Sequence, residues 1–155
     1  TVKSFEGKFD IRKGMDPMYS ESFSILAGNS TLETISAKPE GLTDYQFPAV
    51  FYGRGKGIHG TTPFNGVLLK QILSKHFPVN KENLQKGLFI ITGKDGYHGA
   101  YTFSEVMNRN DQAEFLLVPW PKDKNGGVFQ IFPAADFFSD RAVSSVESIR
   151  FSVCR

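Results

Sequence analysis

The run from Leu88 to Phe103, LFIITGKDGYHGAYTF, constrains the fold more than any other part of the sequence. Its apolar start, Leu88 to Ile91, contains β-branched residues and predicts a strand, while Asp95-Gly96 favours the positive φ angles of a tight hairpin turn. A second strand must therefore follow. Thr102 and Glu105 have the spacing of a capping box, which satisfies free amides at a helix start. The run predicts two antiparallel strands followed at once by a short helix.

Apolar runs bounded by turn residues predict the other strands. We expect them over residues 4–11, 22–26, 32–37, 49–52, 115–120, 128–132 and 146–153, with the last one closing the sheet. Phe64 to His76 has apolar residues at intervals of three and four and ends before Pro78, which predicts the clearest helix. Alternate glycines from Gly53 to Gly60 predict a loop, and residues 134–145 are irregular. The expected fold class is α+β, rich in strands with a few short helices.

A chain of 155 residues suffices for one domain, residues 1–155, that buries a core without disulfides or a structural metal. The net charge of +2 is too small to indicate a nucleic-acid surface, and there is no transmembrane run. Cys154 is the only cysteine, which rules out an internal disulfide. The chain begins at Thr1 and not at methionine, which indicates a processed or trimmed form.

Several segments together resemble the sulfite-oxidase-type molybdopterin-binding domain family. Asp95-Gly96-Tyr97 and Glu105 match the family's Asp-Gly-Tyr hairpin and its short helix with a glutamate. Residues 64–73 resemble its Trp-x-Gly-Val-Pro-Leu segment, residues 126–133 its Gly-Gly-Pro-Leu-Arg strand, and residues 148–151 its closing Arg-Ile-Glu-Val strand. The motifs follow the family's order over the C-terminal part of the chain. The resemblance implies a mixed, β-rich sulfite-oxidase-like fold with a molybdopterin-binding pocket.

The resemblance also has a gap at the metal. The family's oxidoreductases hold molybdenum through one cysteine thiolate shortly before the Trp-x-Gly-Val segment, whereas residues 45–63 contain no cysteine. Cys154 belongs to the final strand and is expected to face away from Ile149 and Phe151. The family's tryptophan is replaced by Phe64. Molybdenum is therefore not expected, and a pterin is the candidate cofactor.

The glycine-rich stretch from Gly53 to Gly60 is the first candidate site. Its glycines let the backbone approach a ligand closely, and Arg54, Lys56 and His59 carry groups that attract an anion. It matches neither a phosphate-binding loop of the Walker type nor a dinucleotide fingerprint. The resemblance places cofactor contacts here, and the alternative is a surface loop whose cations are merely solvated.

Further candidates come from later in the chain. The resemblance places Arg141 where a lysine approaches the cofactor phosphate, and a guanidinium grips such an anion with two parallel hydrogen bonds. Asp136 lies beside two phenylalanines and has the chemistry to pair with the amino-pyrimidine edge of a pterin. His98, which follows the hairpin turn, and Phe64 are the remaining candidate ligand-binding residues. Tyr97 is expected to be a half-buried strand residue with its hydroxyl in water. Asp136 and Arg141 are alternatively ordinary turn or loop residues.

These observations favour a non-catalytic module that binds a pterin-like or other small anionic ligand. The expected partner of this module is a signalling or redox protein. One alternative is a molybdopterin-dependent oxidoreductase with an oxygen ligand in place of sulfur. Another is a structural or interaction domain whose pocket is filled by Phe64 or by Phe137 and Phe138. Stand-alone domains resembling this family are often exported in bacteria, so a periplasmic location is expected, with the cytoplasm left open.

Overall fold

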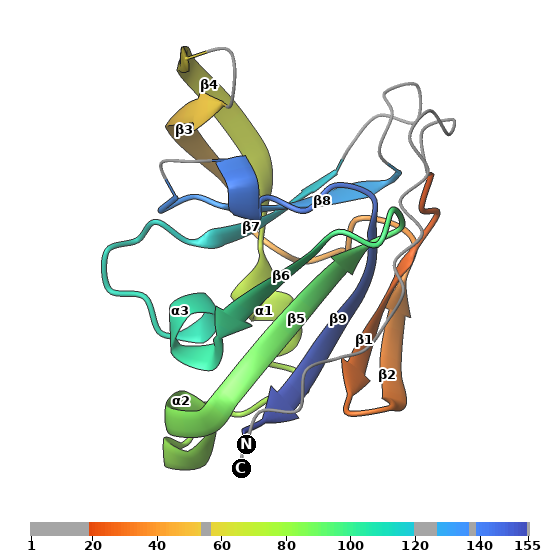
Figure 1. Cartoon of the computed structure of the whole chain (residues 1–155). Helices are drawn as coiled ribbons and strands as arrows, with labels where there is room; N and C mark the ends of the chain where they lie inside the picture. Colours follow the sequence, from red (N-terminus) through yellow and green to blue (C-terminus); the bar gives the residue numbers. More distant parts are fainter. Residues whose placement is uncertain (1–18, 54–56, 120–126, 137–138, 155) are drawn as a thin grey trace.

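The computed structural model describes residues 19–53, 57–119, 127–136 and 139–154, without the side chains of residues 50–53, 57–62 and 139. These residues form two β-sheets and three short α-helices (Figure 1), so the β-rich α+β class is confirmed. The strand expected over residues 4–11 lies outside the described residues. The other expected strands are all present, several with shifted ends.

The five-stranded sheet has the order β2-β1-β9-β5-β6. Its strands are β1 (Phe23–Ala27), β2 (Ser30–Ile35), β5 (Gly87–Gly93), β6 (His98–Thr102) and β9 (Val146–Val153). We expected the last strand to close the sheet, and this prediction is wrong. Strand β9 is an interior strand, because it pairs with β1 on one side and with β5 on the other. The β1–β9 pair is parallel and the rest are antiparallel. Burial of alternate residues along β5 shows that one face of this sheet covers the core.

The hairpin and helix predicted from the run at Leu88 are confirmed. Strands β5 and β6 pair from Leu88–Thr102 to Thr92–His98, and α3 (Phe103–Met107) follows directly. Only Gly96 in the turn has a positive φ, 83°, so the connection is not the two-residue turn that Asp95-Gly96 suggests. The capping box has both of its hydrogen bonds.

The four-stranded sheet, of order β3-β4-β7-β8, corrects two predictions. Its strands are β3 (Asp44–Gly53), β4 (Gly57–Leu68), β7 (Phe115–Pro119) and β8 (Phe129–Pro133). The stretch from Gly57 to Gly60 is not a loop but part of β4, and Gly57 to His59 pair with the end of β3 in a long hairpin that projects beyond β7 and β8 (Figure 1). Strand β4 also contains the first part of the predicted helix. Its pairing with β3, and with β7 at Val67 and Leu68, overrides the helical spacing.

Only the second part of the predicted helix is helical, as α1 (Leu69–Leu73). A further helix, α2 (Lys81–Lys86), was not predicted. Asn80 caps it by accepting a 2.8 Å hydrogen bond from the backbone amide of Asn83. Helix α2 has only six residues, too few to show an apolar pattern with helical periodicity, so the Asn80 cap is its main signal in the sequence.

The main hydrophobic core draws residues from both sheets and from α1 and α3. Phe77, Phe89, Phe103 and Phe151 form its aromatic centre, with Phe89 and Phe103 stacked at a centroid distance of 5.7 Å. A second, smaller cluster of apolar residues lies on the four-stranded sheet and draws members from all four of its strands. The Phe64 and Phe132 rings stack there at 3.9 Å. The residues that follow β8 pack between this cluster and β6, and they contain the candidate site.

Candidate functional site

Arg141 lies at the end of a single 3₁₀ turn, Ser139–Arg141, next to three polar or aromatic side chains. Its guanidinium donates a hydrogen bond to the Glu105 carboxylate on α3, and its Nε lies 3.2 Å from Oδ2 of Asp136. The guanidinium carbon also lies over the ring of Tyr101, 4.7 Å from the centroid. We call Glu105, Asp136, Arg141 and Tyr101 the arginine cluster.

The capping box places Glu105 in this cluster. Thr102 Oγ1 accepts a 3.1 Å hydrogen bond from the Glu105 amide, and Glu105 Oε2 accepts one of 3.3 Å from the Thr102 amide. The other carboxylate oxygen, Oε1, accepts the hydrogen bond from Arg141. The Glu105 side chain therefore both caps the start of α3 and accepts the hydrogen bond from Arg141.

Thr102→Ala is expected to destabilise the protein by about 1 kcal/mol, because it removes the acceptor for one free amide at the start of α3 and loosens Glu105. Urea denaturation followed by circular dichroism measures this. Thr102→Ser keeps the hydroxyl and serves as the control, which should lose much less stability. Equal losses for the two variants would show that the threonine methyl group, and not the cap, carries the effect.

Two tyrosine hydroxyls hold the 3₁₀ turn against β6. Tyr101 donates to the carbonyl oxygen of Arg141, and Tyr97 donates to that of Asp140. The prediction that Tyr97 is a half-buried strand residue is wrong, because Tyr97 lies just before β6 and is 43% exposed, although its exposed hydroxyl also bonds to the protein. Tyr101 is fully buried, and this burial raises the pKa of its phenol well above the usual range, although the Arg141 charge opposes the shift. The phenol thus stays neutral and acts as a hydrogen-bond donor.

The charge of Arg141 is already balanced within the protein. Burial lowers the pKa of its guanidinium, but the hydrogen bond to Glu105 and the negative charges of Asp136 and Glu105 outweigh burial and raise it. Burial also raises the pKa of Asp136, and the Arg141 charge only partly opposes this. Two carboxylates against one guanidinium leave the cluster with one excess negative charge when all three are ionised. A small anion would therefore meet net repulsion here.

One polar pair in the cluster is close but poorly aligned. Asp136 Oδ2 and Arg141 Nε are both buried and have no aligned hydrogen-bond partner among the described residues, although they lie 3.2 Å apart. The Asp136 side chain is 19% exposed and that of Arg141 is 41% exposed. Oδ2 itself is enclosed by protein atoms, so only the remaining, partly exposed portion of the Asp136 carboxylate is open to N–H donors from a ligand.

Among the predicted site residues whose side chains the structure describes, Asp136 and Arg141 are brought together. Phe64 lies on β4 in the second cluster, where Ala142, the residue after Arg141, also packs. His98 begins β6, is exposed, and has its Nδ1 at 3.2 Å from the Gly96 carbonyl oxygen. His59 pairs with Phe51 in the hairpin, while its side chain, together with Arg54 and Lys56, lies outside the described residues.

Glu105 and Tyr101 are the members of the cluster that sequence reasoning did not identify as site residues. The capping box already explained the glutamate at position 105, so the sequence contains no separate indication that Glu105 also binds Arg141. Tyr101 is the buried residue at the end of an alternating strand, the ordinary position of a core aromatic residue. Tyr101 belongs to the run that predicts the β5–β6–α3 unit and Glu105 lies two positions beyond it, but only the return of the chain after β8 brings Arg141 to them.

Cys154 lies far from this cluster. It follows the end of β9, is exposed, and its amide donates a 2.9 Å hydrogen bond to Lys86 at the end of α2, at the opposite end of the fold from the 3₁₀ turn (Figure 1). Within the described part of the chain, no three His, Cys, Asp or Glu side chains gather closely enough to hold a metal ion. None of the described helices has the length and apolar character needed to cross a membrane.

A scan against models of known protein families finds no match for this sequence, and neither does a search of curated proteins. The function therefore rests on the chemistry of the site itself.

Proposed function

We propose that the chain is a non-catalytic binding module with a sulfite-oxidase-type fold, which recognises a pterin-like heterocycle through Asp136. The motifs that carry the resemblance fall on regular elements of the β-rich fold: Gly66 and Val67 on β4, Tyr97 and Glu105 around β6 and α3, and the last motif on β9. This order is consistent with the resemblance.

The observation that carries the proposal is the charge balance around Asp136. Arg141 is held by Glu105 and Asp136, so the cluster has an excess of hydrogen-bond acceptors and negative charge. A pterin presents an amino group and a ring N–H side by side, and the Asp136 carboxylate accepts both hydrogen bonds if Oδ2, which is buried 3.2 Å from Arg141 Nε, turns toward the ligand. Of the two ligand types that the sequence allows, the geometry favours the donor-rich heterocycle over a simple anion.

Apolar surface for the flat face of such a ring lies close by in the sequence and the fold. Ala142, the residue after Arg141, packs in the second cluster with the stacked Phe64 and Phe132 rings. Heterocycle sites commonly combine an apolar wall with a few fixed polar groups. The proposal therefore assigns the polar edge to Asp136 and the wall to residues of this cluster.

A reduced pterin, such as 6,7-dimethyltetrahydropterin, should raise the melting temperature, while inorganic phosphate should not. At a concentration of about 100 times Kd, the expected gain is about 2.7 kcal/mol, or roughly 5 to 10 °C for a protein of this size. Asp136→Asn should abolish the shift, since asparagine presents an NH2 donor in place of the second oxygen that the pterin edge requires. Asp140→Asn, which changes an exposed carboxylate nearby, is the matched control.

Three results would contradict the proposal. These are equal stabilisation by phosphate, an unchanged pterin response in Asp136→Asn, and stoichiometric molybdenum in the natively purified protein. The last result would favour the molybdopterin-dependent oxidoreductase with a ligand other than cysteine.

The stacked Phe64–Phe132 pair favours a second candidate, a structural or protein-interaction domain. The two rings lie 3.9 Å apart, nearly parallel at 10°, so they already cover each other's faces. In this candidate, Phe64 fills the position that a cofactor would otherwise take. Failure of every pterin and anion to shift the melting curve, with Phe64→Ala restoring no binding, would support it.

A further inference from the structure

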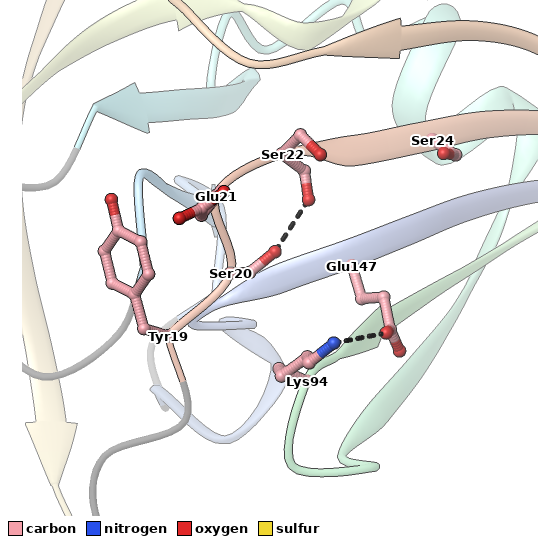
Figure 2. Close-up of a pocket in the computed structure, with 7 residues that line it drawn as sticks. All are labelled: Tyr19, Ser20, Glu21, Ser22, Ser24, Lys94 and Glu147. Carbon is pink, nitrogen blue, oxygen red and sulfur yellow. Dashed lines mark hydrogen bonds and ion pairs between the residues drawn. The ribbon is translucent and has the colours of Figure 1, made fainter.

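A polar pocket of about 490 Å³ lies on the five-stranded sheet, and none of its lining residues belongs to the arginine cluster. Figure 2 shows Tyr19 and Glu21 on one side of it, Lys94 and Glu147 on the other, Ser20 and Ser22 between them, and Ser24 further along β1. The lining residues are Tyr19, Ser20, Glu21, Ser22, Ser24, Lys94 and Glu147. They come from the start of β1, the turn after β5 and the start of β9.

Hydrogen bonds of the Ser20 side chain and backbone fix the shape of this pocket. Ser20 Oγ contacts the carbonyl oxygens of Ser22 and Val146 at 2.7 and 2.8 Å, and the Ser20 carbonyl accepts a 2.9 Å hydrogen bond from Val128. Gly127 has a φ of 78°, and a Cβ there would meet the Ser20 backbone at 2.6 Å, so the two segments are tightly joined. A pocket built this way loses little freedom when a ligand binds.

The groups left for a ligand are hydroxyls and charges. The Ser20 hydroxyl is used within the protein, and Ser24 Oγ lies 3.3 Å from Thr34 Oγ1, whereas the Ser22 hydroxyl has no such partner among the described residues. Lys94 Nζ lies 3.2 Å from Glu147 Oε1, with both side chains about half exposed. Glu21 has no hydrogen bond or ion pair with any other described residue. The pocket thus offers acceptors from two carboxylates, donors from one ammonium group, and hydroxyls that act as both.

From this chemistry we infer that the pocket binds a neutral polyhydroxylated ligand, such as a monosaccharide unit. An anion would meet two carboxylates against one lysine, and an apolar molecule would bury these polar groups without hydrogen bonds. A sugar hydroxyl both donates and accepts, so it pairs with carboxylates, ammonium and serine hydroxyls in turn. The Tyr19 ring is the one aromatic group in the lining, suited to the C–H face of a sugar ring.

Titration of ¹⁵N-labelled protein with glucose, mannose and N-acetylglucosamine tests this, with inorganic phosphate as the anionic probe. At least one sugar should shift the amide signals of Ser22, Ser24 and Lys94 in a saturable way. Glu21→Ala should weaken that binding about tenfold, because it removes a charged acceptor. Glu82→Ala, which changes an exposed glutamate on α2, should leave it unchanged.

Lys94→Met provides a second variant and should also weaken sugar binding. The inference is overturned if no sugar in the panel gives a saturable shift at these residues. It is equally overturned if phosphate binds as tightly as the sugars, or if folded Glu21→Ala and Lys94→Met both bind like the unaltered protein. Pterin binding at Asp136 is measured separately and does not enter this test.

Discussion

Replacing Gly66 with alanine is expected to destabilise the protein by about 3 kcal/mol, because the added methyl group has nowhere to go. Gly66 lies on β4 where this strand meets β7. A Cβ at this position would overlap the carbonyl oxygen of Leu117 and lie 3.2 Å from Cα of Val118. Both obstacles are backbone atoms of a buried strand, so no side-chain rotation relieves the clash.

Gly41→Ala is the matched control for this prediction. Gly41 has a φ of 74° and open space around its Cα, so alanine there causes only backbone strain of about 1 kcal/mol. Urea denaturation of both variants gives the comparison. A Gly66→Ala variant no less stable than Gly41→Ala would mean that β4 and β7 separate easily, and that their contact does not fix the hairpin.

The same glycine illustrates how far the sequence predicts this fold. Gly66 stands in the segment that resembles the family's Trp-x-Gly-Val motif, and close strand contact is a physical reason for a glycine there. Apolar spacing around it nevertheless predicted a helix. The spacing of Phe64, Leu68 and Ile72 fits a helix as well as a strand followed by a helical turn, and only the pairing with β3 and β7 decides between them.

Local signals predicted local structure well. The capping box at Thr102 and the positive φ of Gly96 depend on neighbouring residues alone, and both are confirmed. The arginine cluster depends on a long-range return of the chain, since Arg141 and Glu105 are 36 positions apart. Sequence reasoning identified Arg141 and Asp136 as polar residues in an irregular segment, but it treated Arg141 as an unpaired cation. The partner that balances its charge was predicted only as a helix cap.

Replacing Arg141 with methionine is expected to cost about 2 kcal/mol of stability at neutral pH. Removing one partner of a buried ion pair costs about 3 to 5 kcal/mol, and we lower this figure because the Arg141 side chain is 41% exposed. Methionine keeps much of the apolar packing on Tyr101 but leaves Glu105 and Asp136 without their shared cation. Thermal and urea denaturation at neutral pH measure the loss.

Removing the two carboxylate charges should restore the lost stability. In a Glu105→Gln/Asp136→Asn background, Arg141→Met is expected to change stability by less than about 0.5 kcal/mol beyond the loss of contact with Tyr101, since no anion is left to balance. Glutamine still completes a capping box, so α3 should keep its start. A full 2 kcal/mol loss in this background would assign the effect to packing and not to charge.

The pH dependence of stability gives an independent check that the Arg141 charge stabilises the fold by balancing the carboxylates. Because burial raises the pKa of the Asp136 carboxyl above the usual value of an aspartate, the native state keeps this proton to higher pH than the unfolded state does. The contribution of Asp136 to the free energy of unfolding is therefore most favourable below the pKa that this carboxyl has in the unfolded state. It declines as the pH rises through the pKa of the folded state. Arg141 limits this decline by lowering the pKa of Asp136, so Arg141→Met should steepen it. The stability difference between Arg141→Met and the unaltered protein should be small at about pH 3 and reach its full size near pH 7. A difference that stays constant from acid to neutral pH would show that Arg141 does not act by balancing these carboxylates, and the charge argument that favours a donor-rich ligand at Asp136 would fail with it.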